Sequence, residues 1–157
     1  MVIEKQIVLP HLQNIVHVTY RVVKAPQPIF LRLRPVMAFR KLESAVDEPL
    51  ARDYRVTARG HEYEIWAGPE LPVLRMTIEG AELPLTLDGG ARRDIVYPVE
   101  AERGYESRGS LWTPGYFSGP LSQGQTLSFV AATEPWQRLW ALPPADVLRF
   151  EKWRRRR

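Results

Sequence analysis

The sequence predicts an all-β domain, a sandwich of antiparallel sheets, followed by a short helical extension. Apolar and polar residues alternate with a period of two in several short segments, which is typical of strands with one buried face. The 157 residues include 14 prolines and 10 glycines, a composition that fits short strands and turns better than a helical bundle. Helical spacing is confined to the last quarter of the chain. We therefore expect a sandwich over residues 1–134 and a helical extension over residues 135–157.

The clearest predicted strand covers residues 15–23. Four residues share its drier face, namely Val16, Val18, Tyr20 and Val22. The same alternation recurs over residues 31–34, 54–59 and 74–79, and a late strand over residues 126–132 buries Leu127 and Phe129. Turn formers separate these segments, namely Gly60, Gly68-Pro69, Gly80, Asp88-Gly89-Gly90 and Ser122-Gln123-Gly124. The strands are expected to pair antiparallel.

The extension contains two segments with helical spacing. Trp136, Leu139 and Trp140 follow the i, i+3, i+4 pattern of one helical face. Pro143-Pro144 then opens a segment in which Val147, Phe150 and Trp153 or Arg154 follow a similar period. Proline is tolerated in the first turn of a helix, so the second helix is expected to begin there.

Net charge and composition exclude several classes of protein. The net charge is +4, but the last seven residues hold five basic residues and one acidic residue, so residues 1–150 are neutral overall. A nucleic-acid-binding face would spread its basic residues over the fold, so neither nucleic acid nor a membrane is an expected partner. The chain has no cysteine, which excludes disulfides and thiolate metal sites. No apolar run approaches the ~20 residues of a membrane span, which predicts a soluble, cytoplasmic domain.

Motifs for metal binding or nucleophilic catalysis are missing from the sequence. His11, His17 and His61 are not spaced as metal ligands, and we expect them to face solvent or to be hydrogen-bonded, with no metal or cofactor. The serines at positions 107, 110, 118 and 122 lack the glycine-flanked elbow of a hydrolase nucleophile. Gly89-Gly90 lacks the flanking residues of a phosphate-binding loop and fits a hairpin turn.

Two pairs of carboxylates are candidates for glycoside hydrolysis, which needs only two carboxyl groups at the right separation. Glu62 and Glu64 lie two residues apart on one face of a predicted strand, and a solvated face explains them better than catalysis. Glu100 and Glu102 lie near a cluster of aromatic residues, where a structural role competes with a catalytic one.

The segment 97–117 is rich in aromatic residues, namely Tyr97, Tyr105, Trp112, Tyr116 and Phe117, within a polar and glycine-rich stretch. The C–H faces of sugars lie flat on aromatic rings, while carboxylates and arginines bind the hydroxyls. The segment is therefore either a carbohydrate-contacting or interdomain loop, or a long loop that packs its aromatic rings into the core. The sequence favours neither interpretation.

An ordered run of short motifs covers most of the chain. Its later members are Tyr97-Pro98, Glu102-Arg103-Gly104, Leu111-Trp112-Thr113-Pro114-Gly115 with Tyr116-Phe117, and Leu121-Ser122-Gln123-Gly124. Its earlier members are Glu4-Lys5, Pro10-His11, Val18-Thr19-Tyr20-Arg21, Leu31-Arg32-Leu33-Arg34-Pro35 and Phe39-Arg40. The run resembles the N-terminal domain of bacterial and archaeal glycogen debranching enzymes of the amylo-alpha-1,6-glucosidase type. It departs from that family at Gly109-Ser110, where a Glu-Asp pair is usual, and at Leu42-Glu43, near which a histidine is common.

The resemblance implies a β-supersandwich, similar in shape to galactose mutarotase, that packs on an (α/α)6 barrel carrying the two catalytic carboxylates. This sequence has no room for the barrel, and it is expected to lack the family's opening segment. The resemblance therefore implies a fragment, an excised domain or a split gene product without catalytic residues of its own. It also implies that residues 143–157 are the start of an arginine-rich connector into the barrel.

Our leading hypothesis is a non-catalytic domain that packs on the barrel and helps to bind α-glucan, such as glycogen or maltooligosaccharide. The residues expected to contact glucan or the barrel are Glu102, Arg103, Tyr105, Trp112 and Tyr116, with Glu102 orienting Arg103 through a salt bridge or loop hydrogen bonds. One alternative is a structural interaction module without sugar contact. Another is a sugar mutarotase, which would need its histidines and carboxylates in one cleft. Exposed sheet edges also predict a homodimer.

Overall fold

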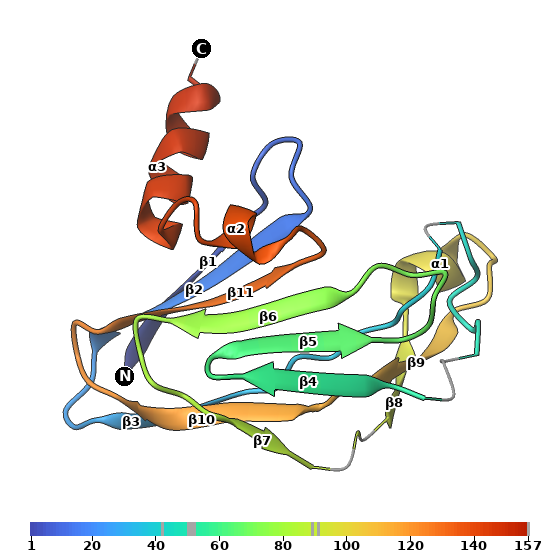
Figure 1. Ribbon diagram of the computed structural model, residues 1–157, viewed down its shortest axis with the longest axis horizontal. Coiled ribbons are helices and arrows are strands. Elements are labelled where there is room, and N and C mark those ends of the chain that lie inside the picture. The colour runs from blue at the N-terminus through green and yellow to red at the C-terminus, as the bar shows by residue number, and fades with distance from the viewer. Residues whose placement is uncertain (42, 50–52, 89, 91, 157) are drawn as a thin grey trace.

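The computed structural model describes residues 1–41, 43–49, 53–88, 90 and 92–156 (Figure 1). Leu42, Gly89 and Arg157 lie outside these residues. The largest sheet contains β1 (Val2–Val8), β2 (Ile15–Lys24), β11 (Thr126–Ala132), β6 (Leu74–Glu79), β5 (Glu62–Trp66) and β4 (Arg55–Arg59), in that spatial order. A second sheet contains β3 (Ile29–Leu33), β10 (Gly115–Leu121) and β7 (Leu85–Leu87), and β8 (Arg92–Val96) pairs with β9 (Arg108–Trp112).

Every pairing between these strands is antiparallel, which confirms the predicted all-β class. The predicted strands correspond to β2, β3, β4, β6 and β11. Three helices complete the described chain, namely α1 (Pro98–Glu102), α2 (Trp136–Leu139) and α3 (Pro144–Arg154). None of them is long and apolar enough to cross a membrane.

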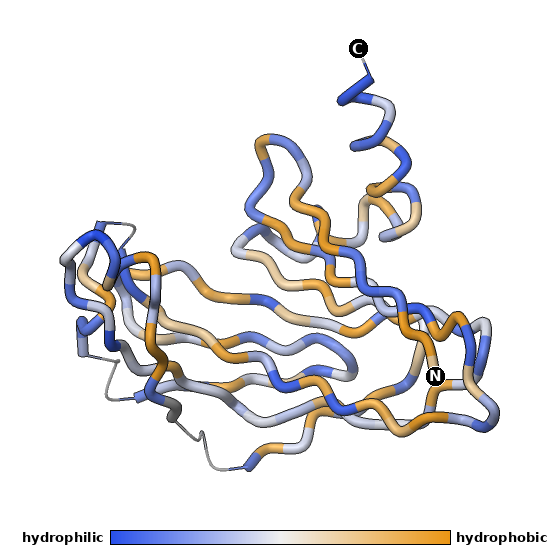
Figure 2. Tube along the Cα trace, turned by 180° about the vertical axis from the view of Figure 1, so that it is seen from behind, coloured by the Kyte–Doolittle hydropathy of each residue, from blue (hydrophilic) through white to orange (hydrophobic). Residues whose placement is uncertain are grey.

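The main core lies between the six-stranded and three-stranded sheets. Its fully buried side chains include Val22, Ile65, Met76 and Leu127 from the larger sheet and Phe117 from the smaller one. Burying each such side chain contributes about 1.5–3 kcal/mol relative to leaving it exposed. Seen from behind, hydrophobic and hydrophilic residues alternate along many of the strands, as expected for sheets with one buried face (Figure 2).

A smaller core lies on the outer face of the six-stranded sheet. Ile15, Val130, Ala132 and Leu139 form it, with Trp136 packed against them. The helix α2 covers this face above the paired strands β2 and β11 (Figure 1). Both faces of these two strands are therefore partly covered, which a period-two pattern alone does not indicate.

This second core corrects the prediction for His17, which was expected to face solvent or to be hydrogen-bonded. His17 is 3% exposed on the same face of β2 as Ile15, and its Nδ1 has no hydrogen-bond partner among the described residues. Burial lowers the pKa of His17 because the charged imidazolium would lose its hydration. The polar face of the predicted strand is dry here because α2, which is far away in the sequence, folds over it.

The helix α3 begins where the sequence predicts, since Pro143 is its N-cap and Pro144 its first residue. Its buried face differs from the prediction, however. Val147 and Glu151 are buried, whereas Phe150 is 47% exposed and Trp153 is 54% exposed. The Glu151 carboxylate accepts the backbone N–H of His11 at 2.9 Å and pairs with Arg154 at 2.8 Å, so a carboxylate rather than an aromatic ring faces the body of the protein. The C-terminal half of α3 stands away from the sheets (Figure 1).

Candidate functional site

The five predicted site residues are not brought together. Glu102, Arg103 and Tyr105 lie at the end of α1 and in the turn after it, Trp112 ends β9, and Tyr116 lies in β10. Glu102, Arg103 and Tyr105 are exposed, whereas Trp112 is buried and Tyr116 is half-buried.

Trp112 belongs to the interior of the sandwich. Its ring stacks on Tyr54 with centroids 4.2 Å apart and planes inclined by 10°, and only 7% of the residue is exposed. Its backbone N–H donates to the Met37 carbonyl at 2.8 Å and its carbonyl accepts the Met37 N–H at 2.9 Å. Phe117 is also fully buried. For these two rings, the core-packing interpretation of the aromatic segment describes the structure.

Tyr116 lies beside two arginines. The guanidinium of Arg32 is 4.3 Å from the ring centroid and that of Arg34 is 5.2 Å away. Arg34 also forms an ion pair with Asp88, at the end of β7. Cation–π contacts of this kind contribute about 0.5–1 kcal/mol each at an exposed site. The ring therefore helps to order the side chains of its own sheet.

Tyr105 is the most exposed of the predicted aromatic residues, with 67% of its surface accessible. It lines a hollow of about 440 Å³ between the α1 turn and a wall formed by Arg40 and residues 43–46. The other lining residues are Arg40, Glu43, Ser44, Ala45, Val46, Glu100 and Glu106. This hollow combines an accessible aromatic ring with three carboxylates and one guanidinium. Such a set can stack on an apolar ring face and bind hydroxyl groups around it.

Backbone hydrogen bonds fix the turn that carries Tyr105. The Tyr105 N–H donates to the Glu100 carbonyl at 3.0 Å, and the Arg103 N–H donates to the carbonyls of Val99 and Glu100 at 3.2 Å. No ion pair joins Glu102 to Arg103 in the described part of the chain. No hydrogen bond joins the Glu102 side chain to Arg103 there either, so the expected role of Glu102 in orienting Arg103 stays a prediction, and backbone bonds hold the turn.

Gly109 explains one departure from the family pattern. It is buried, and a Cβ added there would lie 2.1 Å from the carbonyl oxygen of Val46. Its neighbour Ser110 donates its hydroxyl to Asp94 at 2.8 Å. An acidic side chain at position 109 would therefore displace the segment that forms one wall of the Tyr105 hollow. The small residue at 109 and the position of Val46 in the wall therefore depend on each other.

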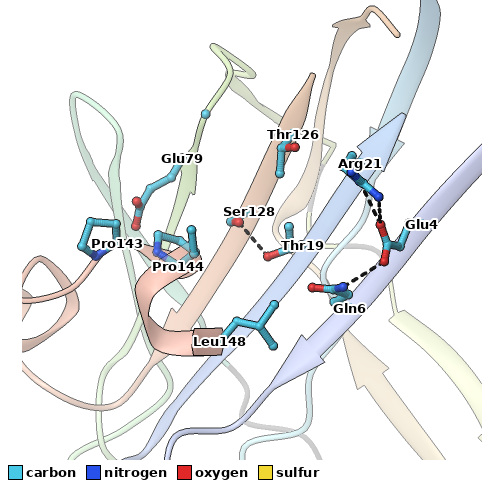
Figure 3. A pocket seen from close by; sticks show the side chains of 12 residues that line it. Glu4, Gln6, Thr19, Arg21, Glu79, Thr126, Ser128, Pro143, Pro144 and Leu148 are labelled. Atoms are coloured by element: carbon cyan, nitrogen blue, oxygen red, sulfur yellow. Dashed lines mark hydrogen bonds and ion pairs between the residues drawn. The ribbon is translucent and has the colours of Figure 1, made fainter. Parts of the chain in front are cut away.

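A second hollow, of about 540 Å³, was not predicted. It lies between the outer face of the six-stranded sheet and the start of α3 (Figure 3). The strand register aligns Gln6, Thr19, Ser128 and Glu79 in one row across β1, β2, β11 and β6. Glu4, Arg21 and Thr126 form the next polar row, and Pro143, Pro144, Ala145 and Leu148 provide an apolar wall. We call this hollow the sheet groove.

Most polar groups of the sheet groove bind one another. Glu4 accepts hydrogen bonds from Arg21 at 2.8 Å and Gln6 at 2.9 Å, and these bonds, the one from Arg21 foremost, lower the pKa of Glu4. The hydroxyls of Thr19 and Ser128 are 2.8 Å apart. The Glu79 carboxylate makes no hydrogen bond or ion pair within the described residues, and burial raises its pKa. It points toward Pro143 and Pro144 (Figure 3).

The pair Glu62 and Glu64 has a structural role. Glu64 accepts the indole N–H of Trp136 at 3.0 Å and the Nε–H of Arg75 at 3.0 Å, and Glu62 accepts the indole N–H of Trp140 at 3.2 Å. The two indoles are stacked 5.7 Å apart. These carboxylates hold α2 and the residue after it against the sheet. This structural role differs from both the solvated face and the catalytic pair.

The three histidines occupy separate elements, with His11 in the β1–β2 loop, His17 in β2 and His61 in the β4–β5 turn. Within the described ranges, no group of three or more His, Cys, Asp or Glu residues could hold a metal ion.

Comparison with known proteins gives one match. No curated protein and no solved structure matches the chain significantly. The family model described as glycogen debranching enzyme N terminal matches residues 1–128. This range includes β1 to β10 and the loop that carries Tyr105, and it ends within β11, before α2 and α3. The chain belongs to the family of glycogen debranching enzyme N-terminal domains.

Proposed function

We propose that the chain is a non-catalytic domain that packs against the catalytic barrel of a debranching enzyme and helps to bind α-glucan in the cytoplasm. Membership of the family supports the association with a larger enzyme. The Tyr105 hollow is the observation that carries glucan binding. It is concave, borders the loop with the family motifs and combines an exposed ring with groups that bind hydroxyls.

Few groups of the Tyr105 hollow must move when a sugar binds. The backbone bonds of Tyr105 to Glu100 and of Arg103 to Val99 and Glu100 already fix the turn. An aromatic side chain loses little conformational freedom when a sugar ring covers it, so the contact retains most of its burial energy. Glu43 and Glu106 are exposed and Glu100 is half-buried beside the ring, where each can accept hydroxyl hydrogens.

The proposed surface toward the barrel is the projecting half of α3. Phe150 and Trp153 are half exposed there, and Lys152, Arg155 and Arg156 add positive charge beyond the Arg154–Glu151 ion pair. The end of the helix is the most hydrophilic part of this region (Figure 2). We propose that residues 143–157 form the connector into the barrel. A homodimer through the flanking strands β1 and β4 of the large sheet stays a prediction.

A purely structural module is the second candidate. The burial of Trp112 and Phe117 and the arginines around Tyr116 favour it, because three of the aromatic residues in the segment stabilise this domain itself. On this alternative, Tyr105 would contact the catalytic domain and not glucan.

Affinity electrophoresis in glycogen and calorimetric titration with maltooligosaccharides distinguish the two candidates. Tyr105→Ala should weaken glucan binding about tenfold, the loss expected from one stacking contact of about 1.4 kcal/mol. Phe30→Ala is the matched control, because Phe30 is 69% exposed on β3 and should leave binding unchanged. Unchanged mobility in glycogen, both for this chain and for the chain joined to its catalytic barrel, would contradict direct sugar contact.

A further inference from the structure

We propose that the sheet groove is a second carbohydrate site, which binds an uncharged oligosaccharide across β1, β2, β11 and β6 independently of the Tyr105 hollow. The proposal deepens the proposed function and rests on it for the identity of the sugar as α-glucan. The residues that line the groove by themselves favour a neutral polyhydroxylated ligand, whatever the family of the chain.

The floor of the groove is an ordered array of hydrogen-bonding groups. Gln6, Thr19, Ser128 and Glu79 occupy one cross-strand row, so they span three inter-strand gaps, or about 14 Å. Their spacing is set by backbone ladders and not by loops. The volume of about 540 Å³ is within the range of about 300–1,000 Å³ that is usual for small-molecule sites. An elongated ligand with hydroxyls at regular intervals matches this floor.

Glu79 is the group that most needs a ligand. Its carboxylate is half-buried and has no partner in the part of the chain that the structure describes, although a desolvated carboxylate is unfavourable without hydrogen bonds. A ligand hydroxyl that donates to Glu79 would compensate this desolvation. The hydroxyls of Thr19 and Ser128 share one hydrogen bond and keep further acceptor capacity toward the groove.

Charge and shape determine the class of ligand. Arg21 is neutralised by Glu4, so among the described residues that line the groove the Glu79 carboxyl is the acidic group without a basic partner. This disfavours phosphates and other anions. Pro143, Pro144 and Leu148 face the polar rows across the groove (Figure 3) and can cover the C–H face of a sugar ring. Hydroxyl-binding groups opposite an apolar wall fit a carbohydrate better than an ammonium or peptide ligand.

The same geometry argues for binding and against hydrolysis. Glu4 and Glu79 are the two carboxylates of the groove, and their strands are three inter-strand gaps apart, about 14 Å. Inverting glycosidases place their carboxyl groups about 6.5–9.5 Å apart and retaining enzymes about 5 Å apart. In Figure 3, Glu4 faces Arg21 and Gln6 while Glu79 points toward the prolines, so the side chains do not converge.

The test is a titration of the whole chain with maltotriose, followed by amide NMR shifts and by calorimetry. The double variant Thr19→Val with Ser128→Ala removes both hydroxyls while it keeps the shape of the side chains, a replacement that is nearly neutral for stability. It should weaken maltotriose binding about tenfold or more, since it removes two hydrogen-bonding groups. Thr57→Val is the matched control, because Thr57 is exposed in β4 of the same sheet outside the groove.

The amide shifts separate this proposal from the proposed function. The sheet-groove proposal expects shifts at Gly80 and Thr126 that persist in Tyr105→Ala. Shifts confined to the Tyr105 turn, with affinity unaltered by the double variant, would overturn the groove and leave the proposed function standing. Shifts confined to the groove would support the groove and refute glucan contact at Tyr105. No response to maltotriose anywhere would refute both, and a stronger groove response to inorganic phosphate would overturn the neutral-ligand class.

Discussion

Replacement of Trp112 by alanine should destabilise the domain strongly without altering the residues that face solvent at Tyr105. Trp112 is 7% exposed, and its ring stacks on Tyr54 with centroids 4.2 Å apart. Truncating a buried Trp to Ala costs about 3–5 kcal/mol, which includes the cavity that remains. The stack accounts for about 0.5–1.5 kcal/mol of that loss. The backbone bonds to Met37 do not involve the side chain, so the strand pairing should persist.

The loss should be large relative to the stability of the whole domain, which is typically about 5–15 kcal/mol. For a chain of this length we expect a fall in Tm of about 6–20 °C. Urea unfolding is the assay, and the midpoint should fall with the m value unchanged. Phe30→Ala, at a position that is 69% exposed, should change stability by less than about 0.5 kcal/mol. A loss below about 1 kcal/mol for Trp112→Ala would refute the assignment of Trp112 to the core.

Two further predictions concern Gly109 and His17. Gly109→Asp should lower the free energy of unfolding, measured in urea, by about 1–3 kcal/mol or more, because its Cβ would lie 2.1 Å from the Val46 carbonyl oxygen. Ser110→Ala removes one hydrogen bond to Asp94 and should cost less than about 1.5 kcal/mol. A fully stable Gly109→Asp variant would show that residues 43–49 do not pack there. The pKa of His17 is lower in the folded state than its ordinary value of 6.5, so the unfolded chain binds the proton more readily and stability should fall as the pH drops below about 6.5. Between pH 7 and pH 5 the native chain should therefore lose more unfolding free energy than the variant His17→Leu does. Equal losses in the two proteins would contradict a buried neutral imidazole at position 17.

The sequence predicts the strands well because the alternation that marks a strand is local. In β4 and β11 the pattern locates the element and identifies the side that packs into the main core. The burial of the opposite side of a strand is less predictable, because the residues that cover that side are distant in the sequence. Thr77 and Ser128 are polar residues that alternation assigns to solvent, yet both are buried.

The candidate sites depended on contacts between residues distant in the sequence. Thr19 and Ser128 are 109 residues apart, and only the β2–β11 register places their hydroxyls together. Glu151 accepts a backbone N–H from His11, 140 residues earlier, which is why the helix buries a carboxylate where its period suggested Phe150. Tyr105 is exposed and Trp112 is buried, and nothing local in the sequence distinguished these two aromatic residues.

The two proposed sites differ in how firmly the fold holds them. The Tyr105 hollow is built from a turn and a loop, so its shape depends on contacts such as that of Gly109 with Val46. The sheet groove takes its floor from four hydrogen-bonded strands, and residues positioned by strands are placed more accurately than residues on loops. Its apolar wall, however, belongs to the start of α3, a helix that contacts β1 and accepts the backbone N–H of His11 through Glu151. A barrel that packs on the projecting half of α3 would therefore also act on the wall of the groove, and the two parts of the proposed function would be coupled through this one helix.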